Sequence, residues 1–315
     1  MNENYLNYLT KMIADVYNIS IKKIIPSKRG FFGETWCLQT DNKDYFIKID
    51  YWEYHKEAYR KSLQIIEFMI NQGISFIPRI IKTKSSDLSF CFNEGIAAIF
   101  DFVDGENTEE YPITRLFEHL VHIYKLDTNG IEIEKESFDM KILNKLKKLK
   151  DDVQLPQKLI DELHKKDELL LKYSEQLLFY SNICKNDMEN FHITHGDAGG
   201  NCIINENNFY IIDWDSLKLA PIERDAWFFM CDDKQLNDIN DVLFNNNVDY
   251  KLNSDRLCYY CYYSFFYYLT EYLQSVLLSQ NEEQKQSITN SLIEYLNTCW
   301  IFKQLKTADE YCIYK

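Results

Sequence analysis

The chain has 315 residues, of which 46% are hydrophobic and 15% aromatic, so we expect one or two globular domains rather than disorder. The formal net charge of −14 argues against broad binding to nucleic acid or anionic membranes, because phosphates would be repelled. The same charge would favour a cationic ligand, or it serves only to keep the protein soluble. The sequence shows no signal peptide, no apolar run of about 18 residues and no paired cysteine motif, which predicts a cytoplasmic protein with free thiols.

The first hundred residues have mainly strand character. Segment 29–34, which contains two glycines, is predicted as a turn between strands. Residues 53–72 contain no helix breaker, place apolar side chains on one helical face and end at Gly73, so they predict a helix. Five apolar-rich runs are predicted as strands, at residues 21–27, 35–40, 44–50, 75–81 and 95–103.

The chain changes to helical character after Gly105. Helical periodicity extends over three segments, residues 114–127, 136–190 with a turn near Pro156, and the region from 222 onward, which includes the strongly aromatic run 257–278. We interpret the aromatic run as a buried core helix, because it has too many aromatic side chains for one exposed face. The predicted fold class is therefore α+β, with a small β-rich lobe and a large helical lobe.

A hairpin is predicted within the helical half, in the stretch THGDAGGNCIINENNFYIIDWD at residues 194–215. It would bring Asp197 and Asn201 at its start close to Asp213 and Asp215 at its end. Three carboxylates and an amide repel one another without a cation, and such hard oxygen ligands suit Mg²⁺ rather than zinc. A carboxylate that does not bind metal could accept a proton from a substrate hydroxyl. The alternative is a solvated acidic hairpin, which the apolar run before Asp213 disfavours.

Phosphate-binding candidates occur in the β-rich region. Gly30 and Gly33 lie between two predicted strands, where backbone N–H groups could approach phosphates or simply form a hairpin turn. Lys48 lies in the middle of a strand, with Ile47 and Ile49 on the opposite face. A lysine on a largely buried strand needs an anionic partner, unless its ammonium group reaches solvent.

These motifs together resemble the aminoglycoside phosphotransferases, which belong with choline kinase to the protein-kinase-like group. The resemblance spans roughly residues 20–235 and rests on FIK, IFDFVDG, HGDAGGN and IIDWD followed by LAPIERDAWFF, in that order. The last segment looks most like the spectinomycin phosphotransferase branch. The resemblance implies a bilobal protein-kinase-like fold, with a nucleotide-binding lobe at residues 1–103 and a helical lobe at residues 104–315 that holds the catalytic loop and the acceptor site.

The resemblance also implies roles for the residues of the hairpin. Asp197 would be the catalytic base that orients the acceptor hydroxyl, and His195 would support the catalytic loop. Asn201 and Asp213 would be ligands of Mg²⁺. These roles match phosphoryl transfer, in which the protein mainly positions the groups and cancels charge.

In the first lobe the resemblance implies a binding site for ATP or GTP. Lys48 would pair with the α- and β-phosphates, and Gly30 and Gly33 would form the turn that covers them. Asp101 and Val103 would offer backbone groups to the purine edge at the junction of the lobes.

The sequence departs from the family pattern in one place and leaves another open. The family usually places the loop asparagine five residues after the catalytic aspartate, whereas Asn201 is four residues after Asp197. The two glycines between them could let a tighter loop reach the same ligand position. The helix glutamate that should pair with Lys48 stays open, because Glu53, Glu57 and Glu67 are all available.

The predicted function is a Mg²⁺-dependent transfer of the nucleotide γ-phosphate to a hydroxyl of a small, cationic molecule, an aminoglycoside or aminocyclitol antibiotic. Two alternatives remain. The first is a metabolic kinase of the same fold, acting on choline, a sugar or an amino alcohol. The second is a non-catalytic, kinase-like scaffold protein, which the shortened loop would favour. The acceptor, the choice between ATP and GTP and the oligomeric state stay open.

Overall fold

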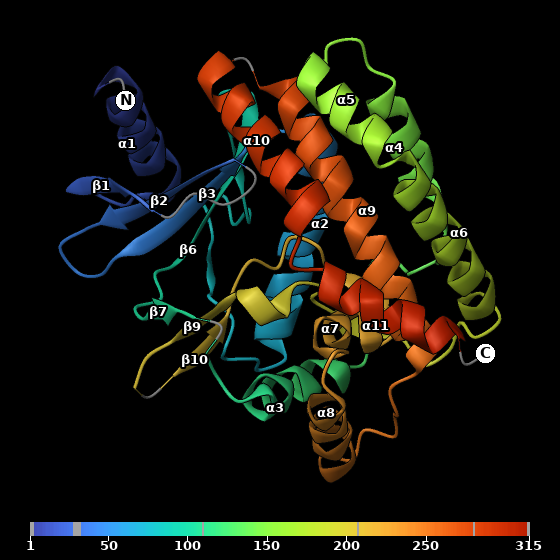
Figure 1. Ribbon diagram of the computed structural model, residues 1–315. Helices are drawn as coiled ribbons and strands as arrows, with labels where there is room; N and C mark the ends of the chain where they lie inside the picture. Colours follow the sequence, from blue (N-terminus) through green and yellow to red (C-terminus); the bar gives the residue numbers. More distant parts are fainter. Residues whose placement is uncertain (1–2, 28–32, 109, 207, 280, 314–315) are drawn as a thin grey trace. The chain divides into compact units, whose positions relative to one another are not determined.

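The computed structural model describes residues 3–27, 33–108, 110–206, 208–279 and 281–313 (Figure 1). Contacts within the chain divide it into two compact units. The first contains Met1–Glu134 and His192–Leu219, and the second contains Lys135–Phe191 and Ala220–Lys315. The predicted combination of a β-rich N-terminal region and a larger helical part is confirmed. The lobe boundary near residue 103 stays a prediction.

The first unit is built on an antiparallel sheet with the strand order β1-β2-β3-β6-β4, and β5 also pairs with β6. The strands are β1 (Lys23–Pro26), β2 (Glu34–Gln39), β3 (Tyr45–Asp50), β4 (Ile80–Ile81), β5 (Phe90–Phe92) and β6 (Gly95–Asp101). All five predicted strands form, although the run 75–81 contributes only the two residues of β4. Strand β5 was not predicted.

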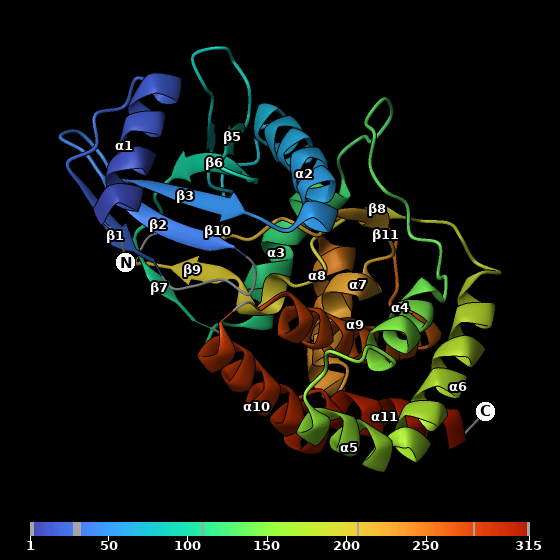
Figure 2. The ribbon, with the colours of Figure 1, turned by 90° about the horizontal axis from the view of Figure 1, so that it is seen from above.

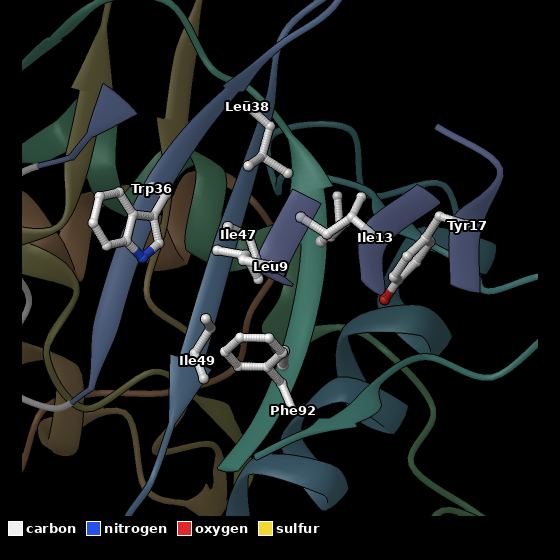
Figure 3. Close-up of a cluster of buried hydrophobic side chains, with 10 residues drawn as sticks. Leu9, Ile13, Tyr17, Trp36, Leu38, Ile47, Ile49 and Phe92 are labelled. Carbon is white, nitrogen blue, oxygen red and sulfur yellow. The ribbon is translucent and has the colours of Figure 1, made fainter. Parts of the chain in front are cut away.

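Two helices cover opposite sides of this sheet (Figure 2). Helix α1 (Glu3–Tyr17) places Leu9 and Ile13 in a buried cluster with Ile47 and Ile49 of β3 (Figure 3). The predicted helix α2 (Glu53–Asn71) lies on the other side, where the centre of its Tyr59 ring is 6.0 Å from the ammonium group of Lys48. Because side chains alternate along a strand, Lys48 faces away from the cluster of α1. Helix α1 was missed, although Leu9 and Ile13 recur at helical spacing in the sequence.

The predicted hairpin completes the first unit. Strands β9 (Cys202–Ile204) and β10 (Phe209–Ile211) pair antiparallel, and β7 (Glu106–Asn107) pairs with the other edge of β9. A short 3-10 helix, η1 (Ala198–Gly200), precedes β9. The remaining elements here are α3 (Ile113–Tyr124), β8 (His192–Thr194) and β11 (Lys218–Ala220), and β8 pairs with β11.

The second unit is helical, and its core is the aromatic helix α9, which contacts α4, α6 and α10 (Figure 1). Phe265 and Phe266 of α9 are fully buried, which confirms the interpretation of this segment as a core helix. The helices are α4 (Lys141–Lys150), α5 (Gln157–Lys165), α6 (Asp167–Cys184), α7 (Glu223–Ala226), η2 (Trp227–Phe229), α8 (Asp233–Asn245), α9 (Ser254–Leu278), α10 (Glu282–Thr298) and α11 (Phe302–Ile313).

Two predictions about the whole chain concern membranes and thiols. Over the residues that the structure describes, no helix combines the length and the apolar character that crossing a membrane requires. The cysteines whose side chains are described are free thiols, and the closely spaced Cys258 and Cys261 are both buried in α9. This agrees with the expectation of free thiols.

Candidate active site

Lys48 forms the centre of the candidate site. Its ammonium group lies 2.5 Å from Oδ1 of Asp213 and also contacts Oδ2 of Asp215, while only 9% of the residue is exposed. Burial alone would lower the pKa of Lys48, but the two carboxylates raise it well above its ordinary value. The prediction that this strand lysine needs an anionic partner is therefore confirmed, and the partners come from the end of the hairpin.

Asp213 and Asp215 follow strand β10 and differ in their environment. Partial burial disfavours the charged form of both, yet the charge of Lys48 holds the pKa of Asp213 below its ordinary value. Burial, together with the neighbouring charge of Asp213, raises the pKa of Asp215. Asp213 has a backbone φ of +64°, which is uncommon for a residue with a side chain and typical of functional sites. This turn redirects the chain directly after the strand.

His195 connects the catalytic loop to the end of strand β10. The residue is buried, its Nε2–H donates to the carbonyl of Ile212 at 2.8 Å, and its Nδ1 accepts from the backbone N–H of Asp197 at 3.1 Å. The imidazole also packs edge-on against Trp214, with ring centroids 4.4 Å apart. These two hydrogen bonds fix the neutral tautomer with its proton on Nε2. His195 thus holds the backbone of Asp197 in place.

The shortened loop keeps Asn201 beside Asp213. The backbone N–H of Ile212 donates to the carbonyl of Asn201 at 2.9 Å, which extends the β9–β10 pairing by one residue. The side-chain Nδ2 of Asn201 donates to the backbone carbonyl and to Oδ2 of Asp197, at 2.7 and 3.2 Å. One turn of 3-10 helix, Ala198–Gly200, spans the four-residue spacing. The backbone of Asn201 is therefore paired with the residue that precedes Asp213.

Tyr111 stabilises the same loop and was not predicted. Its hydroxyl donates to the carbonyl of Gly199 at 2.6 Å, and its ring packs edge-on against Phe209 of β10. Below the loop, the thiol of Cys202 donates to the carbonyl of Ala198. In the sequence Tyr111 simply precedes the predicted helix. Its contact with Gly199 joins residues 88 positions apart, and local patterns do not reveal such contacts.

Of the two predicted phosphate-turn glycines, Gly33 is described and Gly30 lies outside the described residues. Gly33 has a φ of +73°, and a Cβ atom there would lie 2.0 Å from the carbonyl oxygen of Ile49. No side chain fits this close approach, so the turn requires glycine before strand β2. Gly33 thus packs against strand β3 one residue beyond Lys48.

The predicted purine-edge residues lie at the end of β6. The backbone N–H of Asp101 donates to the carbonyl of Arg79 at 2.9 Å, and the carboxylate of Asp101 pairs with Lys43 at 2.5 Å. Val103 follows the strand and is half-buried. The amide of Asp101 is therefore already engaged in the protein. A nucleotide would have to use the Asp101 carbonyl, or the backbone of Val103.

The oxygen ligands at this site fit Mg²⁺. In the part of the chain that is described, no three His, Cys, Asp or Glu side chains gather into a metal-binding group, so the predicted cluster of three carboxylates, Asp197, Asp213 and Asp215, does not form. Mg²⁺ does not require such a group, since one or two carboxylates, phosphate oxygens and water usually complete its shell. Asn201 uses its NH₂ group within the loop, which leaves its carbonyl oxygen as the ligand atom, and Oδ2 of Asp213 lies outside its ion pair with Lys48.

Known proteins resemble this chain in structure but not detectably in sequence. No protein-family model matches the sequence, and no curated protein matches it either. Many solved structures do match, and they include aminoglycoside phosphotransferases and a choline kinase. The chain therefore has the protein-kinase-like fold of these proteins, which confirms the predicted resemblance and fold class.

Three of these structures cover nearly the whole chain. Spectinomycin phosphotransferase APH(9)-Ia, in complex with ADP and spectinomycin, has a TM-score of 0.76 and 19% identity, over 96% of this chain and 98% of that one. A microcompartment-associated aminopropanol kinase has a TM-score of 0.64 and 11% identity, over 97% of both chains. Choline kinase LicA from Streptococcus pneumoniae has a TM-score of 0.59 and 10% identity, over 93% and 99%.

Proposed function

We propose that this protein is a Mg²⁺-dependent phosphotransferase that moves the γ-phosphate of ATP or GTP to a hydroxyl group of a small molecule. The observation that carries the proposal is the meeting of Lys48 from strand β3 with Asp213 at the end of the hairpin. The loop of Asp197 and Asn201 is hydrogen-bonded beside Asp213 in the same unit. A buried lysine, a carboxylate and an amide oxygen are the groups that phosphoryl transfer needs.

In this proposal each residue has the role that the resemblance implies. Asp197 accepts the proton of the acceptor hydroxyl, and His195 holds the backbone of Asp197 through Nδ1. Lys48 pairs with the nucleotide phosphates, a role for which its raised pKa keeps it protonated. Asn201 and Asp213 would hold Mg²⁺, which would supply positive charge opposite the phosphates.

The backbone supplies the remaining contacts to the nucleotide. The turn that the sequence predicts at residues 29–34 would cover the phosphates, and Gly33 holds the end of this segment against Ile49 of strand β3. The carbonyl of Asp101 and the N–H of Val103 receive the purine edge. The engaged N–H of Asp101 leaves that residue the acceptor role.

For the acceptor we propose an aminoglycoside or aminocyclitol. The net charge of −14 favours a cationic molecule, and the fold similarity to spectinomycin phosphotransferase extends over nearly all of both chains. A second candidate, a metabolic amino alcohol, has a separate observation in its favour. The aminopropanol kinase and the choline kinase share the fold over nearly the same length. Both candidates carry an amine and a hydroxyl.

A panel of acceptors tests the proposal and separates the candidates. The protein is incubated with Mg²⁺ and ATP or GTP labelled at the γ-phosphate, together with aminoglycosides, aminocyclitols, amino alcohols or sugars. Transfer of label to the first two groups supports the antibiotic acceptor, and transfer to amino alcohols alone supports the second candidate. Absence of transfer, combined with no thermal stabilisation by Mg·nucleotide, would favour the non-catalytic scaffold. A binder gains about 2.7 kcal/mol at a hundred-fold excess of ligand over Kd.

A further inference from the structure

We infer that Asp215 is the counter-ion that positions Lys48 for the nucleotide phosphates, in the role that the resemblance assigns to a glutamate of helix α2. This inference deepens the proposed function and rests on it. Asp215 lies 167 residues from Lys48 in the sequence, and its Oδ2 accepts a hydrogen bond from the ammonium group. Lys48 thus takes a partner from the segment that also contains the proposed metal ligand Asp213.

The surface of α2 that faces Lys48 carries no acidic residue. Tyr59 and Ser62, one helical turn apart, are both buried there. The ammonium group of Lys48 lies 6.0 Å from the centre of the Tyr59 ring. The hydroxyl of Ser62 donates to the backbone carbonyl of Asp215 at 2.8 Å. The helix therefore supports the segment of Asp215 instead of supplying a carboxylate itself.

The three glutamates of α2 that the sequence left open pair with other cations. Glu53 is hydrogen-bonded to a lysine one turn later, Glu57 lies 3.9 Å from two basic groups of its own helix, and Glu67 lies 2.5 Å from a lysine beyond the helix. The partners are Lys56, Arg60 with Lys61, and Lys82. The side chains of Glu53 and Glu57 are also largely exposed, at 87% and 71%. None of these pairs involves Lys48.

The two aspartates that contact Lys48 differ in a way that divides their roles. Asp213 is the more exposed side chain, at 43%, and lies directly after Ile212, whose N–H pairs with the metal ligand Asn201. Asp215 is less exposed, at 28%, and its backbone is anchored by Ser62. When Asp213 engages a divalent cation, Lys48 still needs an anion in its buried position. Asp215 supplies that anion.

The test replaces the charge of Asp215 without changing its size. Asp215→Asn is expected to weaken Mg·nucleotide binding, measured by calorimetry, about 10- to 100-fold, the range for one hydrogen bond to a charged group. The KM for nucleotide should rise with it. Ser62→Glu in the Asp215→Asn background returns a carboxylate to the helix and should restore part of the affinity. Glu57→Gln and Glu67→Gln are the matched controls and should leave affinity unchanged.

A second measurement decides the inference without any nucleotide. Melting temperatures are compared for Lys48→Met, Asp215→Asn and the variant that carries both substitutions. A second cycle, with Lys48→Met, Glu67→Gln and their double variant, serves as the control. The ion pair is supported if the melting temperature of the double Lys48/Asp215 variant falls by clearly less than the sum of the two single decreases. Additive shifts for Lys48 with Asp215, or coupling of Lys48 with Glu67, overturn it. If the wild type binds no nucleotide, the proposed function fails, and these melting temperatures still decide the ion pair.

Discussion

Replacement of Gly33 by alanine perturbs the close approach to strand β3 through the addition of a single methyl group. At a φ of +73°, any side chain costs about 1–2 kcal/mol relative to glycine. The new Cβ would also lie 2.0 Å from the carbonyl oxygen of Ile49, which is backbone and cannot rotate away. A forced backbone shift of this kind costs about 1–3 kcal/mol more. We therefore expect a loss of about 2–5 kcal/mol in the free energy of unfolding.

Gly73 provides the matched control for this substitution. It also has a positive φ, +90°, but no atom lies within 4 Å of a Cβ built there. Gly73→Ala should thus cost only the conformational term of about 1–2 kcal/mol. Both free energies are measured by urea unfolding, and Mg·nucleotide affinity is measured by calorimetry. Gly33→Ala should weaken nucleotide binding, whereas Gly73→Ala should not. Equal losses of stability in the two variants, with equal nucleotide affinity, would refute the close approach at Ile49.

Three further variants test the hydrogen bonds around the site and in the helical unit. His195→Ala leaves the carbonyl of Ile212 without its donor and should cost about 1–3 kcal/mol in urea unfolding, with a lower rate of transfer. Arg256→Ala removes a buried guanidinium that donates to the hydroxyl of Tyr250 and to the backbone carbonyl of Asp187, both at 2.8 Å, and it should cost about 1.5–3 kcal/mol. Burial lowers the pKa of His192 despite its hydrogen bond to Tyr124. Its contribution to stability is therefore complete above the ordinary histidine pKa and is lost as the pH falls, so His192→Gln should flatten the decline in stability between about pH 7 and pH 5.

His122 is an exposed histidine on α3, so His122→Ala should leave stability and transfer unchanged. A His195→Ala protein as stable and as active as His122→Ala would contradict the anchoring of the catalytic loop. For Arg256, a loss below about 1 kcal/mol, the value of an exposed pair, would show that the guanidinium is not buried. For His192, an unchanged slope of stability against pH would contradict its lowered pKa.

The strand–turn pattern of the sequence was sufficient to predict the hairpin and the orientation of Lys48. Strict alternation in strand β3 placed Ile47 and Ile49 in the core and Lys48 on the opposite face, because successive side chains of a strand point to opposite faces. The pairing of β9 with β10 likewise followed from two apolar runs around a turn. Local periodicity carries this information directly.

Contacts over long distances along the chain could not be predicted in the same way. The local partner of Glu57 follows from the spacing of charges on a helix, so this glutamate could have been set aside. The pairing of Glu67 with Lys82, and of Lys48 with Asp215, depends on how separate elements pack together. Helix α1 is a different case, since its apolar spacing was visible and the region was nevertheless assigned strand character. The tight turn that keeps Asn201 in place also required the structure.

The central claim is that Asp197 acts as the base of a phosphoryl transfer at this site. The most direct measurement is single-turnover transfer of labelled γ-phosphate to the acceptor that the panel identifies, in the wild type and in Asp197→Asn. We predict rapid transfer by the wild type, and a loss of about 100-fold or more in Asp197→Asn with unchanged affinity for Mg·nucleotide. Transfer by Asp197→Asn at the wild-type rate would contradict the account.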